Sequence, residues 1–298
     1  MNTLVVITGP TGVGKTDTAI SIAQALSAEI ISADSRQLYH DIPIGTAAPS
    51  AQQMKLIPHH FVGTLSLDEY YSAAQFENDV MTLLPKLFER SPYVVMCGGS
   101  MLYIDAVCKG IDEIPTISDK IRNMVYAEYE QYGLDYMLQR LQELDPQHYE
   151  IVDKKNYKRV VHAVEICLQA GQPYSSIRTG TTKQRPFRII KVGLNLPREQ
   201  LFDRINRRVL AMIDEGLIDE AKRVYHLRHL NSLNTVGFKE MFAYFDGTMD
   251  YETAVARMQK NTRVYAKKQL TWYAKDKDMQ WFAPNDPTIL EYILQQSK

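Results

Sequence analysis

The sequence has few cysteines, no long apolar run and no surplus of charge of either sign. Its three cysteines, Cys97, Cys108 and Cys167, lie far apart in 298 residues without any C-x-x-C spacing, which excludes a disulfide framework and a zinc knuckle. No apolar run approaches the roughly 20 residues that cross a bilayer, and no basic segment followed by an apolar one opens the chain. We expect a cytoplasmic protein with no membrane contact, and a monomer.

The charge is balanced over the chain as a whole. Lys and Arg number 34 and Asp and Glu number 35, which excludes a globally basic coat of the kind that binds nucleic acid without specificity. Local basic patches are compatible with this balance, so they must be sought segment by segment.

A glycine-rich loop directly follows the first apolar run, Thr3–Thr8. It matches the pattern G-x-x-x-x-G-K-[ST]. In such loops the glycines turn the backbone so that N–H groups point inward, the lysine adds a positive charge, and the next helix presents its N-terminus. The alternative is a glycine-rich turn that binds nothing. The pattern predicts a di- or triphosphate site formed by Gly9, Pro10, Thr11, Gly12, Val13, Gly14, Lys15 and Thr16.

No acid stands where a nucleoside-triphosphate hydrolase needs one. Such enzymes hold Mg²⁺ with a carboxylate at the end of an apolar strand. The candidate strand, residues 93–97, instead runs into Gly98-Gly-Ser100, whose N–H groups and hydroxyl suit an anion. The nearest acid is Asp34, after the predicted strand 29–32, at the edge where open α/β sheets place their sites. We interpret Asp34 as a base; Mg²⁺ binding through water and capping of its own turn are the alternatives.

The order of the predicted elements indicates an α/β fold. Apolar strands alternate with helices through the first third, which is typical of a parallel sheet covered by helices. After Gly110 the chain becomes polar and helical, and strand character returns at residues 187–196. We expect a P-loop NTPase-like parallel sheet flanked by helices, built from residues 1–110 and 186–298, with an all-helical domain inserted at 111–185. Helices are predicted at 15–26, 69–90, 198–215, 218–229, 238–245 and 251–275, with a loop at His59-His60.

The last of these helices is basic. From residue 253 to 275 the chain has six basic residues and no acid. This asymmetry fits the phosphates of RNA, although an ordinary solvated helix face would have a similar composition. Four of the residues recur at spacings of three and four and form one stripe: Arg257, Lys260, Arg263 and Lys267.

Further basic residues lie elsewhere in the chain. A cluster at 154–159 lies inside the predicted helical insertion, and another at 178–188 lies at its exit. Together with the stripe they indicate a track for RNA phosphates. Arg204 and Arg208, four residues apart on a predicted helix, have the spacing to face either RNA or a diphosphate.

Several independent motifs follow the phosphate loop in a fixed order. They are Ser32-Ala-Asp-Ser-Arg-Gln-Leu-Tyr39, Ile44-Gly-Thr-Ala47, Pro58-His-His60, Val95-Met-Cys-Gly-Gly-Ser-Met-Leu-Tyr103, Val236-Gly-Phe238 and Asn261-Thr-Arg-Val-Tyr-Ala-Lys-Lys-Gln-Leu-Thr-Trp272. With them the sequence resembles the tRNA dimethylallyltransferases (IPP transferases) over most of its length. Two positions depart from that pattern: Ser100 stands where the family more often has Thr, and Asn156-Tyr-Lys-Arg159 replaces a commoner Asn-Asp-x-x-Arg.

The resemblance implies transfer of a dimethylallyl group from dimethylallyl diphosphate to N6 of the adenine 3′-adjacent to the anticodon, with release of diphosphate. The phosphate loop would hold the diphosphate, Thr16 would bind a Mg²⁺ ion, and Lys15 would neutralise the leaving group. The implied catalytic residues are Asp34, which takes the N6 proton, and Ser100. The inserted helical domain, 111–185, would serve tRNA binding. Residues implied to contact the anticodon stem-loop are Asp34, Ser35, Arg36, Gln37, Ser100, Arg122, Lys158, Arg159, Arg263 and Lys267.

Other functions stay open. A small-molecule kinase also combines a phosphate loop with an acid after the second strand, but it leaves the basic helix and the insertion without a role. A prenyltransferase acting on free adenine nucleotide is closer, and it would not need the basic insertion. A non-catalytic RNA-binding module that uses a nucleotide as a switch has no use for both Lys15-Thr16 and Asp34.

Overall fold

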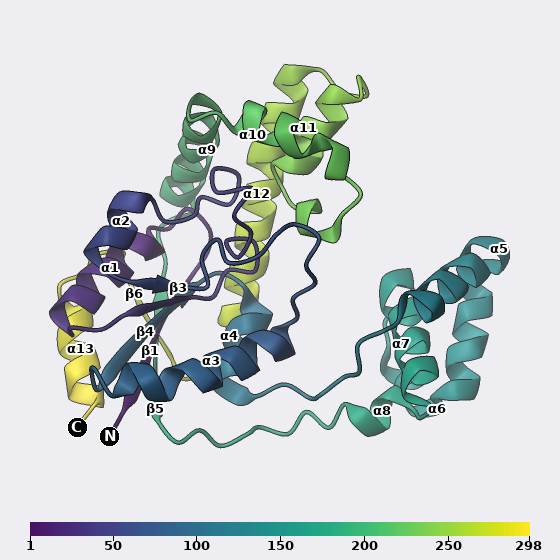
Figure 1. Cartoon of the computed structure of the whole chain (residues 1–298), viewed down its shortest axis with the longest axis horizontal. Coiled ribbons are helices and arrows are strands. Elements are labelled where there is room, and N and C mark those ends of the chain that lie inside the picture. Colours follow the sequence, from purple (N-terminus) through teal and green to yellow (C-terminus); the bar gives the residue numbers. More distant parts are fainter. The chain divides into compact units, whose positions relative to one another are not determined.

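The structure, a computed structural model, describes the whole chain, residues 1–298. Contacts between residues divide it into two compact units (Figure 1). The core unit comprises Met1–Lys109 and Gln184–Lys298, and the helical unit comprises Gly110–Lys183. No helix in the chain combines the length and the apolar character that crossing a membrane requires.

The core unit is built on one six-stranded sheet in which every pair of neighbours is parallel. The strand order is β3-β2-β4-β1-β5-β6. The two central strands are apolar and almost wholly buried, as parallel strands covered on both faces must be. The expected parallel sheet flanked by helices is therefore confirmed. The strands are β1 Thr3–Thr8, β2 Ile30–Ser32, β3 His59–His60, β4 Tyr93–Gly98, β5 Arg188–Leu194 and β6 Met279–Phe282.

Helices cover both faces of the sheet. Because side chains alternate along a strand, Val5 and Ile7 of β1 pack into one core cluster with α1 Lys15–Ala25, α9 Arg198–Asp214 and α13 Thr288–Gln296. Leu4 and Val6 pack into a second cluster on the opposite face. That cluster is formed with α3 Ala73–Phe88 and α4 Met101–Lys109.

A third cluster lies beyond the sheet. The loop after β2 contributes Tyr39 and Ile42, and the C-terminal helices contribute Leu217, Phe238 and Met258 among others. Figure 1 shows these helices rising above the sheet. This arrangement places a helical wall opposite the loops that leave the strands. The wall consists of α9, α10 Leu217–Val224, α11 Phe238–Phe245 and α12 Tyr251–Tyr273, with short helices η1 Tyr225–Leu227 and η2 Asn231–Leu233; α2 Ala51–Leu56 follows β2.

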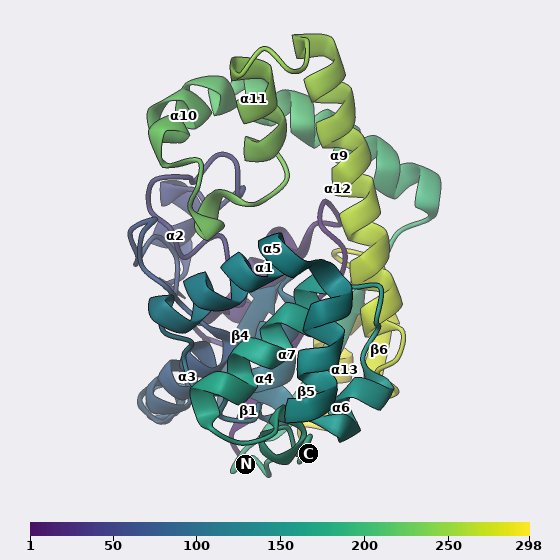
Figure 2. The same ribbon diagram turned by 90° about the vertical axis from the view of Figure 1, so that its right-hand side faces the viewer.

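The helical unit contains helices only (Figure 2). Its longest helix changes direction at Gly133, whose φ of 79° and ψ of −172° are not helical. The core of the unit is a small apolar cluster that includes Val125, Met137, Leu141 and Val160. The helices are α5 Asp119–Leu144, α6 Pro146–Ile151, α7 Tyr157–Ala170 and α8 Tyr174–Ile177.

Several predicted element limits were wrong. Helix α3 begins at Ala73 and not at 69, because Ser72 caps it by accepting a hydrogen bond from the Gln75 N–H. His59 and His60 form the edge strand β3 and not a loop. Helix α10 ends at Val224, five residues before the predicted end, and tightens there into the 3₁₀ turn η1. Strand β6 and helix α13 were not predicted.

Candidate functional site

The phosphate loop connects β1 to α1, and the helix begins at Lys15. Two of its glycines are required by close packing. A Cβ atom on Gly9 would lie 2.4 Å from the carbonyl oxygen of Leu194 in β5, and one on Gly12 would lie 2.8 Å from Cγ1 of Ile205 in α9. Both glycines also have positive φ, 148° and 81°, which other residues rarely adopt. The sequence therefore folds here into a narrow turn between β1 and α1.

Lys15 lies inside this turn. Its ammonium group donates to the carbonyl oxygens of Gly9 at 3.1 Å and Pro10 at 3.0 Å. Burial lowers the pKa of Lys15 from 10.5 to about 8, while the nearby Cys97 and Asp34 oppose that shift and Arg208 adds to it. Lys15 is thus a cation at neutral pH that would gain from a bound anion.

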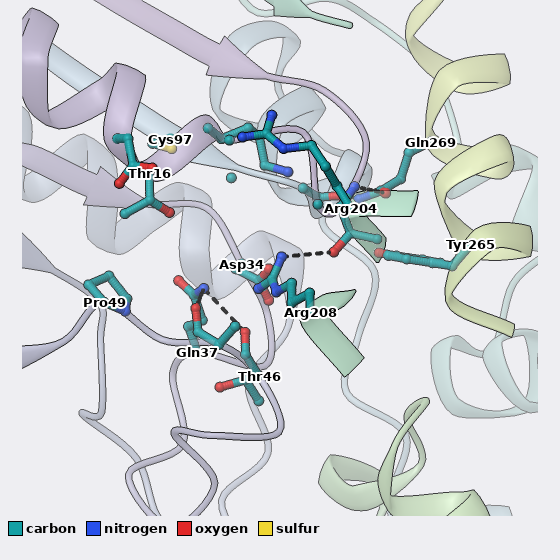
Figure 3. Close-up of a pocket in the computed structure, with 18 of the residues that line it drawn as sticks. Thr16, Asp34, Gln37, Thr46, Pro49, Cys97, Arg204, Arg208, Tyr265 and Gln269 are labelled. Carbon is teal, nitrogen blue, oxygen red and sulfur yellow. Dashed lines mark hydrogen bonds between the residues drawn. The ribbon is translucent and has the colours of Figure 1, made fainter. Parts of the chain in front are cut away.

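A cavity of about 480 Å³ opens beside the loop (Figure 3). It is lined by the loop, by the Gly98-Gly99 turn after β4 and by Asp34 after β2. Acidic side chains on its wall are outnumbered by basic ones, so the cavity attracts anions. The acids are Asp17 and Asp34; the bases are Lys15, Arg204, Arg207 and Arg208.

The three arginines come from one face of α9, at i, i+3 and i+4. Arg204 Nη1 donates to the carbonyl oxygen of Val13 at 2.9 Å, and Arg208 Nη1 lies 3.4 Å from Thr11 Oγ1. Burial lowers the pKa of Arg208, and Asp34 opposes that shift. Arg204 and Arg208, for which the sequence left two roles open, therefore lie against the phosphate loop.

A second cavity of about 350 Å³ meets the first. Asp34, Thr46, Arg208 and Tyr265 belong to the walls of both. The second cavity differs in having an apolar side, formed by Ile205, Val209, Met212, Leu217, Val236 and Met258. An anion site and a partly apolar site thus adjoin, with the carboxylate of Asp34 on the wall that they share.

Asp34 and Ser100 stand on turns after neighbouring strands. The Asp34 carboxylate accepts the Arg36 N–H at 3.0 Å. The Ser100 hydroxyl accepts the Ser35 N–H at 2.8 Å, and the Ser100 N–H donates to the Ala33 carbonyl at 3.1 Å. Both side chains line the second cavity. The structure thus brings together the two residues that the resemblance pairs.

The side chains after Asp34 bind other parts of the core unit. Arg36 Nη1 donates to the carbonyls of Asn231 and Ser232, both at 3.0 Å. Gln37 accepts from Ser32 Oγ at 2.9 Å and donates to the Ala47 carbonyl at 3.1 Å. These bonds hold the cavity wall, and contact of Ser35, Arg36 and Gln37 with tRNA stays a prediction.

The basic stripe on α12 is partly packed. Arg263 donates to Asn206 Oδ1 of α9, and its guanidinium lies 5.9 Å from the centre of the Phe202 ring. Lys267 Nζ lies 5.5 Å from the same ring centre. Lys267 is exposed to solvent, and so are four other basic residues of the segment: Arg257, Lys260, Lys268 and Lys275.

Three basic residues of the helical unit are predicted to contact RNA. Lys158 and Arg159 are exposed in the first turn of α7. Arg122 Nε lies 4.0 Å from Oε1 of the buried Glu165. Their contact with RNA stays a prediction.

Two buried polar residues that hydrogen-bond to the backbone of the cavity walls received no role from the sequence. Gln269 of α12 accepts the Thr11 N–H and donates to the Gly99 carbonyl, both at 2.8 Å. Glu220 of α10 accepts the N–H groups of Ile44 and Gly45, at 2.9 and 2.7 Å. A polar residue on the apolar side of an amphipathic helix was the available signal for each of them.

These features define a class: a parallel α/β protein with a phosphate loop whose anion cavity adjoins a second, partly apolar cavity at one carboxylate. The model of the IPP transferase family matches residues 37–276. A tRNA dimethylallyltransferase of Parabacteroides distasonis is 56% identical over 297 residues, 99% of each chain. Another from Phocaeicola vulgatus is 55% identical over 293 residues, 98% of each chain.

Solved structures agree with this relationship. The tRNA isopentenylpyrophosphate transferase of Bacillus halodurans superposes with a TM-score of 0.72 at 34% identity, covering 99% of this chain and 95% of that one. A eukaryotic dimethylallyltransferase captured acting on tRNA gives a TM-score of 0.80 at 25% identity, covering 99% of this chain and 77% of that one. The chain belongs to the IPP transferase family.

Proposed function

We propose that this protein modifies tRNA by transferring a dimethylallyl group from dimethylallyl diphosphate to N6 of the adenine 3′-adjacent to the anticodon. Its family membership and its relatives, named tRNA dimethylallyltransferases, support dimethylallyl transfer to tRNA. The observation that carries the proposal is the junction of the two cavities at Asp34. The reaction needs an anion site, an apolar site and a proton acceptor within one space.

The diphosphate would bind in the cavity beside the phosphate loop. The loop N–H groups, Lys15 and the arginines of α9 supply donors and positive charge there. Negative charge grows on the leaving oxygen as the bond between C1 of the dimethylallyl group and that oxygen breaks. Groups held in place before the reaction stabilise this charge most effectively, because they do not have to reorganise.

A Mg²⁺ ion would be held mainly by the substrate. The structure has no group of three acidic, histidine or cysteine side chains that could hold a metal ion. Mg²⁺ is often bound through one or two protein oxygens, substrate phosphates and water, and Thr16, which lines the anion cavity, offers such an oxygen. The ion would supply charge neutralisation of the diphosphate.

The acceptor adenine would enter through the second cavity. Its N6 attacks C1 of the dimethylallyl group and the new C–N bond forms. The electrons of the broken C1–O bond leave with the diphosphate. The nitrogen then carries a proton that it loses readily, and Asp34, which lines both cavities, would take it. The adenine must be extruded from its stack to enter the cavity, at a cost of a few kcal/mol.

The alternatives lack an observation in their favour. A kinase or a nucleotide prenyltransferase would use the same anion cavity, but neither would need the exposed basic residues of α12. Those residues favour RNA as the acceptor.

The test is a transfer assay with purified protein, dimethylallyl diphosphate and Mg²⁺. Anticodon stem-loop RNA, AMP and a stem-loop with guanine 3′ of the anticodon are offered as acceptors, and the digested nucleosides are analysed by mass spectrometry. We expect N6-dimethylallyladenosine from the first RNA only. Transfer to AMP and not to RNA, or phosphate transfer from ATP with no prenylation, would overturn the proposal.

A further inference from the structure

Gln269 connects two backbone segments that lie far apart in the sequence. It projects from α12 toward the phosphate loop (Figure 3), and its side chain is buried. The amide oxygen accepts the Thr11 N–H and the amide nitrogen donates to the Gly99 carbonyl, each at 2.8 Å. One amide therefore joins the phosphate loop to the turn after β4.

The surroundings of Gln269 require a side chain that both accepts and donates a hydrogen bond. Neighbouring buried residues of α12, such as Ala266 and Tyr273, pack into the apolar core clusters. A polar side chain there is costly unless its groups are hydrogen-bonded. Gln269 meets this condition because its acceptor faces an N–H and its donor faces a carbonyl. An apolar side chain of the same length would fill the space and make neither bond.

The two segments that Gln269 joins both face the anion cavity. β1 and β4 are neighbours in register, with Thr8 opposite Gly98. Beyond these residues the strands end and sheet hydrogen bonds no longer fix the two segments to each other. Thr11 and Gly99 both line the cavity, so the gap between them affects the width of the space in which an anion would bind.

We propose that Gln269 is a positioning residue that holds the phosphate loop against the Gly98-Gly99 turn and thereby sets the affinity for the diphosphate. The inference rests on the proposed function, because it takes the diphosphate of the prenyl donor as the anion. Gln269 acts through Thr11 and Gly99.

Gly99 provides a second way to break the same contact. A Cβ atom at this position would lie 2.5 Å from Gln269 Nε2, the end of a flexible side chain, and 3.6 Å from Lys15 Nζ. Gly99 does not have a positive φ, so alanine is compatible with its backbone. Gly99→Ala would displace the amide while leaving the rest of Gln269 in the core.

The experiment measures binding of inorganic diphosphate with Mg²⁺ by calorimetry, without tRNA, together with the KM for dimethylallyl diphosphate and kcat. The variants are Gln269→Met, Gly99→Ala and the double variant. Losing buried hydrogen bonds predicts diphosphate binding weaker by roughly ten- to hundredfold. The double variant should be no weaker than the weaker single variant, because both changes remove the same contact.

Gln259→Met is the matched control. Gln259 lies on the same helix and donates to the Asn206 carbonyl of α9 at 3.3 Å, but it lines neither cavity. The control should lose some thermal stability and keep the diphosphate affinity. If Gln269→Met and Gly99→Ala behave like this control, the role of Gln269 is only structural and the inference is wrong.

Gln269→Glu keeps the inference testable if the methionine variant fails to fold. An ionised glutamate accepts the Thr11 N–H but cannot donate to Gly99, whereas a protonated one can do both. Compared with wild type over the same pH range, diphosphate binding should recover as the pH falls. A constant ratio to wild type would overturn the inference.

The proposed function fails separately from this inference. A wild-type protein that binds diphosphate but does not prenylate RNA overturns the function alone. A wild-type protein that prenylates RNA, with unchanged diphosphate binding in the Gln269 and Gly99 variants, overturns the positioning role alone.

Discussion

Ser100 and Ser35 form a pair of hydrogen bonds between the turns after β4 and β2: the Ser35 N–H donates to Ser100 Oγ at 2.8 Å, and the Ser100 hydroxyl donates to Ser35 Oγ at 3.1 Å. Ser35 directly follows Asp34 in the chain. The hydroxyl of Ser100 therefore fixes the turn that carries the proposed base, in addition to lining the cavity.

This pair predicts the effect of changes at Ser100. Ser100→Ala leaves the partly buried Ser35 N–H without its acceptor, at about 1–3 kcal/mol, and we expect kcat to fall by roughly ten- to hundredfold. Ser100→Thr keeps the hydroxyl and should retain most activity. Steady-state kinetics of both variants is the measurement. Equal losses would contradict the role of the hydroxyl, because the threonine variant retains it.

Asp34→Asn tests the base directly. An amide of the same shape cannot take the N6 proton, so kcat should fall by roughly 10²–10⁴ while tRNA binding in a filter assay changes little. The result that contradicts this role is lost binding of dimethylallyl diphosphate that is restored by higher Mg²⁺, because Asp34 would then be a metal ligand.

Lys15 predicts a pH dependence of donor binding. Its pKa is lowered to about 8, chiefly by burial, so the free protein loses this cation as the pH rises through 8. Affinity for dimethylallyl diphosphate should then decline above pH 8, and Lys15→Arg, which stays charged, should be weaker but flat between pH 7 and about 10. Calorimetry across this range is the measurement, and an equal slope in both proteins would exclude Lys15 as the titrating group.

The lowered pKa of Lys15 also determines how this residue makes the free energy of unfolding depend on pH. Between the folded pKa of about 8 and the ordinary value of 10.5, the unfolded chain binds more protons at Lys15 than the folded chain does. The free energy of unfolding contributed by this residue therefore rises with pH across that interval. The charge on Lys15 therefore lowers the free energy of unfolding, and a bound diphosphate would offset this loss.

The sequence predicted those parts of the site whose residues are contiguous in the chain. The phosphate loop is one uninterrupted pattern, and Asp34 and Ser100 could be placed because each follows an apolar strand. Gln269 and Glu220 could not be assigned in this way, since the backbone groups that they bind lie at least 170 residues away in the chain. Their contacts exist only after α10 and α12 have packed.

The same reasoning explains the missed elements. Strand β3 has two residues, too few for a periodic pattern, and it is formed by pairing with β2 at the sheet edge. Helix α13 packs Ile289 and Ile293 under the sheet, but its nine residues stand alone near the chain end with no side-chain cap. Tertiary packing decides both cases.

Glu220→Gln should loosen the wall formed by residues 42–47. The carboxylate of Glu220 is fully buried and accepts two backbone N–H groups, whereas a glutamine turns its NH₂ toward one of them. We expect a loss of about 1–3 kcal/mol in the free energy of unfolding and a raised KM for dimethylallyl diphosphate, because Thr46 and Ala47 line the anion cavity. Urea denaturation and kinetics are the measurements.

Asp219→Asn is the matched control for Glu220→Gln. Asp219 precedes Glu220 in the chain, and its side chain is 79% exposed. It should leave both quantities near wild type. An unchanged KM in a destabilised Glu220→Gln variant would show that the packing of residues 42–47 does not affect donor binding.

The exposed lysines of α12 predict how salt affects tRNA binding. Lys267 and Lys268 are exposed and line no part of the anion cavity. Each lost phosphate contact releases about one fewer counterion, so changing both to Gln should raise the KM for tRNA and flatten the salt dependence of binding by up to about two units of slope. Donor affinity without tRNA should not move. An unchanged slope in a folded variant would make this face an ordinary solvated one, and would leave RNA recognition to the helical unit around Lys158 and Arg159.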